Sequence, residues 1–166
     1  MAEKASHKLL GIQVLGTGAV DKMTDIAVTA ISLGASVEQL ASMDFAYAPP
    51  FSTAIHPIAH AVNILLNKMN GEMDSFSPAQ YQEGEAEGYR IVDCAMQPSL
   101  PKHPYLDLVK IKGEQEGYKK DEKLLLVCTK GKRAYLTQNR LKHYGYTNTK
   151  VLEGGTTFNT SIMDEE

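Results

Sequence analysis

The clearest potential for chemistry lies in six consecutive residues, Cys128, Thr129, Lys130, Gly131, Lys132 and Arg133. The apolar run 123–128 places the thiol at the carboxyl end of an expected strand, directly before an expected helix, and open α/β sheets bind ligands at that edge. If the following residues curl into a loop, their N–H groups and basic side chains favour the thiolate. A thiolate attacks sulfur electrophiles and can hold a terminal sulfur as a persulfide. The alternative is a buried strand-end cysteine beside a basic surface turn.

The elements expected around this cysteine alternate between short apolar strands and a helix. Residues 89–93, 123–128 and 149–152 are apolar runs typical of strands, and residues 133–144 show a helical pattern. Runs that are apolar throughout, such as 124–127, need a sheet covered on both faces. The sequence therefore predicts a small parallel α/β domain.

The first part of the chain predicts an α+β unit with one strand. Residues 9–15 form an apolar run before Gly16 and Gly18, and a single strand cannot satisfy its own backbone. Its sheet partners are therefore expected elsewhere or in another subunit. The two glycines imitate half of a dinucleotide-binding fingerprint, but Asp21 stands at the third glycine position, so we interpret the segment as a turn. Helices are expected over three ranges, 21–33, 36–43 and 57–69.

The composition argues against several classes of function. The chain has 166 residues, with 17 basic and 20 acidic side chains and a net charge of −3, so no positive field favours nucleic acid. No apolar run approaches the roughly 18 residues of a membrane span, and no signal peptide is visible, so a cytoplasmic location is expected. The two cysteines lack zinc-ligand spacing, and His56 and His60 lack a third ligand, so no metal is expected.

A change in composition separates two unlike units. Residues 1–74 form the first unit, and residues 89–166 form a second unit that is richer in charge. The polar and acidic segment 75–88 is expected to link them, with Ser77 and Gln80 capping one short helix inside it. The sequence therefore predicts an α/β protein of two domains joined by a linker.

The segment CTKGKRA, followed by a helix, a strand and Gly154-Gly155, resembles the rhodanese-like domain, whose active loop has the form Cys-x-x-Gly-x-Arg. The resemblance implies a three-layer α/β domain with a small parallel sheet. In it Cys128 would be the sulfur-accepting nucleophile, the amides of residues 129–133 an anion cradle, and Arg133 a brace for the loop. Asp93 matches the acidic residue that ends an early strand in this family, which implies a supporting role.

Residues 8–71 are similar to the C-terminal dimerisation domain of FAD-dependent pyridine nucleotide-disulfide oxidoreductases, particularly the coenzyme A-disulfide reductase and NADH oxidase branch. The stretch AYAPPFS at 46–52 is its most specific part. The resemblance implies a homodimer or association with a flavoprotein reductase, in which Tyr47 contacts the partner's active site. Some members of the family continue from this domain into a rhodanese domain. The present chain has the same order of domains. The dinucleotide-binding domains of that family would need about three hundred further residues. FAD and NAD(P)H are therefore expected only on a separate reductase partner, and no cofactor in this chain.

Three hypotheses remain open. The first is rhodanese-like persulfide handling through Cys128 with a small sulfur-containing or thiol substrate, within a coenzyme A-disulfide or persulfide reductase-type system. The second is a non-catalytic dimerisation or docking module, supported by Ala95, where the family usually has Arg, and by 100–113, which lacks a Gly-His-Ile-Pro-Gly-like segment. The third is the detached tail of a split FAD-dependent oxidoreductase. Cys94 is expected to act as a small apolar residue, with a resolving role toward Cys128 less favoured.

Overall fold

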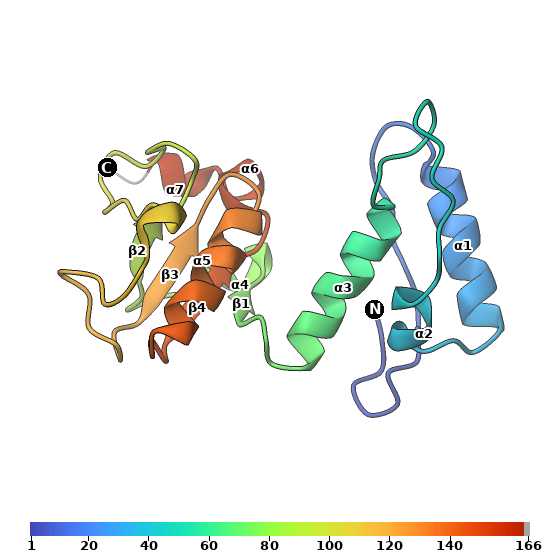
Figure 1. Ribbon diagram of the computed structural model, residues 1–166, viewed down its shortest axis with the longest axis horizontal. Helices are drawn as coiled ribbons and strands as arrows, with labels where there is room; N and C mark the ends of the chain where they lie inside the picture. Colours follow the sequence, from blue (N-terminus) through green and yellow to red (C-terminus); the bar gives the residue numbers. More distant parts are fainter. Residues whose placement is uncertain (165–166) are drawn as a thin grey trace. The chain divides into compact units, whose positions relative to one another are not determined.

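The computed structural model describes residues 1–164, which fold as two compact units with the boundary in the chain after Gly71 (Figure 1). The first unit spans Met1–Gly71, and the second begins at Glu72. Gly71 adopts a left-handed backbone with φ of 74°, directly after the last helix of the first unit, where glycine commonly ends a helix. Each unit has its own hydrophobic core.

Residues 75–88, which the composition indicates as a linker, instead belong to the second unit. Strand β1 (Ser75–Phe76) pairs in parallel with β4 (Thr149–Leu152), and Phe76 is buried in the core. Helix α4 (Pro78–Gln82) follows, and the predicted capping box is present. A strand of two residues leaves almost no periodicity in the sequence, so this polar, glycine-containing segment has the pattern of a linker.

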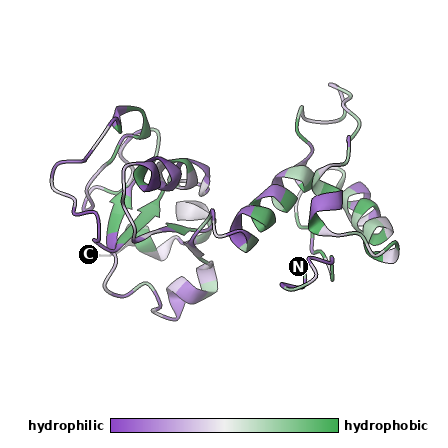
Figure 2. Ribbon diagram, turned by 60° about the horizontal axis from the view of Figure 1, so that its bottom comes forward, coloured by the Kyte–Doolittle hydropathy of each residue, from purple (hydrophilic) through white to green (hydrophobic). Residues whose placement is uncertain are grey.

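The second unit contains the predicted parallel sheet. Its four strands run in the order β1-β4-β3-β2, all parallel, with β2 at Arg90–Asp93 and β3 at Leu124–Val127. All four residues of β3 are buried, because this strand has neighbours on both sides and layers on both faces. In Figure 2 the strands lie toward the hydrophobic end of the colour scale.

Helices cover both faces of this sheet and give the expected three layers. Helix α5 (Lys132–His143) packs on β3 and β4, and its apolar residues share a core with Leu124 and Leu126. Leu125 and Val127 point into the opposite core, which contains residues of α4 and α7. The remaining elements are the 3-10 helix η1 (Leu108–Lys110) and the short helices α6 (Gly155–Phe158) and α7 (Ser161–Asp164).

The first unit confirms its three predicted helices, α1 (Val20–Ser32), α2 (Val37–Ala41) and α3 (Pro57–Met69). The predicted strand over residues 9–15 was wrong. Leu9 forms an isolated bridge with Ala2, and residues 10–15 form no strand. The apolar run lacks a neighbouring strand, and Leu15 at its end is fully exposed.

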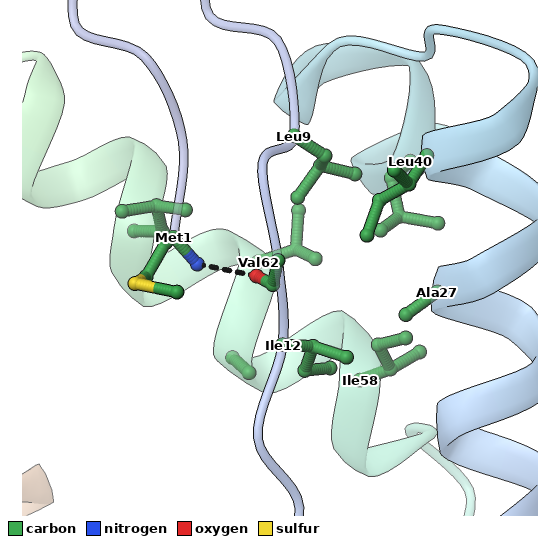
Figure 3. A pocket seen from close by; sticks show the side chains of 11 residues that line it. Met1, Leu9, Ile12, Ala27, Leu40, Ile58 and Val62 are labelled. Atoms are coloured by element: carbon green, nitrogen blue, oxygen red, sulfur yellow. Dashed lines mark hydrogen bonds between the residues drawn. The ribbon is translucent and has the colours of Figure 1, made fainter.

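The helices of the first unit and the extended segment near its start surround an apolar cavity of about 200 Å³ (Figure 3). The α-amino group of Met1 donates a hydrogen bond of 2.7 Å to the Gly11 carbonyl at its edge. Every side chain that lines the cavity is apolar, so this unit holds a hydrophobic space without catalytic groups. In the part of the chain that the structure describes, no helix combines the length and the apolar character needed to cross a membrane.

Candidate active site

Cys128 lies immediately after β3, at the carboxyl end of the sheet, as the sequence predicts. The residue is 4% exposed, and its Sγ accepts a hydrogen bond of 3.2 Å from the backbone N–H of Gly131. Gly131 is the N-cap of α5 and has a φ of 96°, a conformation that a residue with a Cβ rarely adopts. The glycine therefore lets the chain fold back over the sulfur and begin α5 at Lys132, four residues after the cysteine.

The loop after Cys128 is fixed from one side by α6. The Thr156 N–H donates to the Cys128 carbonyl at 3.0 Å, and the Thr157 N–H and Oγ1 donate to the Thr129 carbonyl at 3.0 and 2.7 Å. No peptide bond in the described chain is cis, so the N–H of each peptide points opposite to its carbonyl. The N–H groups of Thr129 and Lys130 therefore point away from α6.

Gly155 makes this close approach between α6 and the loop achievable. A Cβ at this position would lie 1.8 Å from the Cys128 carbonyl oxygen, and its φ is 51°. The pair Gly154-Gly155 stands out in the sequence, but its role and the roles of Thr156 and Thr157 appear only in the structure. A glycine pair directly after a strand, at the edge that carries the cysteine, was the available signal.

The basic side chains of the loop divide into two kinds. Lys130 and Lys132 are exposed, whereas Arg133 is half-buried. Arg133 Nε donates to the Cys94 carbonyl at 3.1 Å, and its Nη2 lies 3.3 Å from Oδ1 of Asp107. Arg133 thus connects the first turn of α5 to the end of β2, a geometry that fits a brace. Asp107, which also caps η1, was not identified from the sequence.

Asp93 is fully buried at the end of β2 and organises the segment that follows. Its carboxylate accepts hydrogen bonds from the N–H groups of Ala95 and Leu100, both at 2.9 Å, and from the N–H and hydroxyl of Ser99. Among the hydrogen bonds to this carboxylate is the one from the N–H of Ala95, the residue that stands where the family usually has arginine. The geometry fits a supporting role for Asp93.

The second cysteine, Cys94, is fully buried beside this site. Its thiol donates to the Val92 carbonyl at 3.5 Å. Burial raises the pKa of the Cys94 thiol to about 12, so it is protonated at neutral pH. This environment agrees with the expectation that Cys94 packs as a small apolar residue.

Two other predicted features lie in the first unit. Tyr47 is in the segment between α2 and α3 and is 62% exposed, and its contact with a partner's active site stays a prediction. His56 caps α3 by accepting a hydrogen bond from the Ile58 N–H at 3.3 Å, and its ring stacks on Phe45. Among residues 1–164, no three acidic, histidine or cysteine side chains are grouped to hold a metal ion.

The glycine-containing turn of the first unit does not fit a dinucleotide. A dinucleotide fingerprint needs a strand immediately before the glycines, and residues 10–15 form no strand. Gly18, with a φ of 97°, turns the chain into α1. The segment is therefore the turn that the sequence analysis describes.

Comparison with known proteins identifies both units. Residues 1–59 match the pyridine nucleotide-disulphide oxidoreductase dimerisation domain, and residues 51–157 match the rhodanese-like domain. The second match covers more than half of the chain, so the protein belongs to the rhodanese-like family. Its two-part organisation is that of the C-terminal part of a rhodanese-fused reductase.

Three longer proteins share parts of this organisation. A NAD-dependent persulfide reductase from A. fulgidus is 31% identical, with a TM-score of 0.80 over 95% of this chain and 29% of its own. The Bacillus anthracis CoADR-RHD is 23% identical, with a TM-score of 0.74 over 87% of this chain and 27% of its own, a likeness of fold. An NADH oxidase from Methanocaldococcus jannaschii is 35% identical over 65 residues, 39% of this chain and 14% of that protein. The chain thus spans less than a third of the length of each.

Proposed function

We propose that Cys128 accepts a sulfane sulfur as a persulfide and passes it to an acceptor thiol. The observation that carries this proposal is the environment of its Sγ, which accepts the Gly131 N–H while α6 holds two loop carbonyls on the other side. Backbone donors on the sulfur side favour an anionic sulfur. With thiosulfate as donor, the Cys128 thiolate attacks the outer sulfur, the sulfur–sulfur bond of thiosulfate breaks, and sulfite leaves with the bonding electron pair.

The second half of the cycle returns the enzyme to its starting state. An acceptor thiol takes the outer sulfur of the Cys128 persulfide, the bond between the two persulfide sulfurs breaks, and Cys128 leaves as a thiolate. Lys130 and Lys132, exposed on the loop, would attract anionic donors and acceptors. The residues in these roles are Cys128 as nucleophile, residues 129–133 as the cradle, Arg133 as brace and Asp93 as support.

The reductase context is the second part of the proposal. We infer that the chain works in the cytoplasm with a coenzyme A-disulfide or persulfide reductase-type system, as a homodimer or bound to a flavoprotein. FAD and NAD(P)H would reside on that partner. The dimerisation-type first unit and the resemblance to the persulfide reductase of A. fulgidus support this context.

A non-catalytic docking function is the alternative. Ala95 is 4% exposed, so the side chain that replaces the expected arginine cannot reach a substrate. On this alternative the second unit would keep the fold without sulfur transfer, and the first unit would pair subunits or bind a separate flavoprotein. Co-purification with a FAD-containing protein, without sulfur uptake at Cys128, would favour it.

The deciding experiment is the intact mass of the reduced protein after exposure to thiosulfate or a persulfide donor. Immediately after loading, wild type is expected to have gained one sulfur, about 32 Da, that a reductant removes, while Cys128→Ser gains none. Equal masses for wild type and Cys128→Ser across donors would reject the proposal.

A further inference from the structure

The two cysteines of the chain are neighbours on the sheet. Cys94 directly follows β2 and Cys128 directly follows β3, and the preceding residues Asp93 and Val127 are paired in register. The Cys94 N–H donates to the Val127 carbonyl at 2.6 Å, so the pairing continues to the cysteines. Both side chains belong to the same core, on the α5 side of the sheet.

This placement brings the backbones of the two cysteines as close as those of disulfide-bonded residues. Adjacent strands lie about 4.8 Å apart, and disulfides join residues whose Cα atoms are roughly 4.4 to 6.8 Å apart. Cys94 and Cys128 are also close enough for a charge on one sulfur to affect the other, since a Cys128 thiolate contributes to the raised pKa of Cys94. The backbone spacing of the pair therefore lies in the range that disulfides bridge.

We propose that Cys94 is a resolving thiol that attacks the inner sulfur of a Cys128 persulfide. The proposal rests on the proposed function, because it needs a persulfide on Cys128. A Cys94–Cys128 disulfide forms, the bond to the outer sulfur breaks, and hydrogen sulfide leaves with the Cys94 proton. The two cysteine sulfurs are oxidised and the sulfane sulfur is reduced by two electrons, so the step needs no external oxidant. A thiol or dithiol reductant then restores both cysteines.

The raised pKa does not prevent this step. At pH 7 a thiol of pKa about 12 is ionised to about one part in 10⁵. Well-placed groups in one molecule react with effective concentrations of about 10⁵ M or more, which offsets that fraction. External reagents lack this advantage, so Cys94 is expected to react only with a sulfur already bound to Cys128.

The test loads the full, reduced chain with thiosulfate, removes excess donor and follows intact mass and free sulfide without oxygen or reductant. Thiosulfate releases sulfite on loading, so any sulfide comes from the resolving step. Wild type is expected to lose the added sulfur, release one equivalent of sulfide and end about 2 Da below the reduced mass, with the bond mapped to Cys94 and Cys128. Cys94→Ala is expected to keep the persulfide at least ten times longer, with thermal unfolding as the check on its fold.

A persulfide that persists equally in wild type and Cys94→Ala would overturn the proposal.

Failure of the proposed function is recognised separately with methyl methanethiosulfonate, which places a methylthio group on Cys128 without any sulfurtransferase activity. Wild type should then expel methanethiol and form the disulfide, whereas Cys94→Ala should keep the adduct. If thiosulfate does not load but this disulfide forms, the donor chemistry is wrong and the resolving role stands. A stable adduct in wild type would overturn the resolving role whatever thiosulfate does.

Discussion

Substitution of Gly155 by alanine should displace the Cys128 loop and slow sulfur loading, although Gly155 lies in α6 and not in the loop. The new Cβ would lie 1.8 Å from the Cys128 carbonyl oxygen and 2.7 Å from the Thr129 carbonyl carbon, both backbone atoms. Because real Cβ contacts stay beyond 3.0 Å, α6 and the loop must separate by more than 1 Å. A misplacement of about 1 Å lowers rates on the order of a hundredfold, and we expect that decrease in the rate of sulfur loading.

The stability cost of Gly155→Ala has two parts that can be worked out separately. A left-handed backbone costs alanine about 1 to 2 kcal/mol. Separation of α6 from the loop also breaks the bonds from the Thr156 and Thr157 N–H groups, at about 1 kcal/mol each. The free energy of unfolding should therefore fall by about 3 kcal/mol in urea titrations.

Gly117→Ala provides the matched control. Gly117 also has a left-handed backbone, with φ of 80°, but no atom lies within 4 Å of its Cβ position. This variant should lose only the backbone part of the stability and load sulfur at the wild-type rate. If Gly155→Ala and Gly117→Ala load sulfur equally fast, the account of a loop positioned by α6 is refuted.

Three further predictions concern the residues around Cys128. Arg133→Lys should lower the free energy of unfolding by about 1 to 2 kcal/mol in urea titrations, because one ammonium cannot reproduce the bonds to the Cys94 carbonyl and Asp107. A urea midpoint equal to that of wild type would contradict the bracing role. Asp93→Asn replaces a carboxylate that accepts several hydrogen bonds, so it should lower the free energy of unfolding by about 1 to 3 kcal/mol and speed amide exchange over residues 94–100. Unchanged exchange over these residues would contradict the supporting role of Asp93. Burial raises the pKa of Cys94 above the unfolded-state value of about 8.5, so the native state holds the thiol proton more tightly than the unfolded state does. The resulting stabilisation is complete below about pH 8.5 and is lost as the pH rises from there toward 12. Urea titrations from pH 8 to 11 should show this decline in wild type and a weaker one in Cys94→Ala, and parallel curves would argue against a buried, neutral thiol.

The sequence predicted those parts of the second unit in which the burial or position of a segment is visible in a short run of residues. Leu124–Val127 is apolar throughout because β3 is buried on both faces, and the turn at Gly131 follows from a cysteine placed between a strand and a helix. β1 could not be predicted, because two residues are too few to show the alternation of apolar and polar side chains that is typical of a strand. Its partner β4 also lies about 75 positions away in the sequence. Such a pairing depends on tertiary contacts that no local window contains.

The residues of the candidate site likewise fall into those that the sequence identifies and those that it does not. Cys128, Arg133 and Asp93 could be identified because they belong to a contiguous motif or to a strand end. Asp107 and the threonines of α6 could not, since each acts through backbone or ion-pair contacts with residues that are distant in sequence. In the first unit, the apolar run 9–15 has the composition of a strand but no neighbouring strand, so composition alone gave the wrong secondary structure.

The most direct test of the central claim is a complete transfer cycle followed on Cys128. The reduced Cys94→Ala protein, which is expected to keep the persulfide, is loaded with thiosulfate, the peptide that contains Cys128 is identified by mass, and an acceptor thiol is then added. The account predicts a gain of about 32 Da on that peptide alone, its loss on addition of the acceptor, and a persulfide on the acceptor. An unmodified Cys128 peptide under every donor, or equal sulfur uptake by Cys128→Ser, would contradict it.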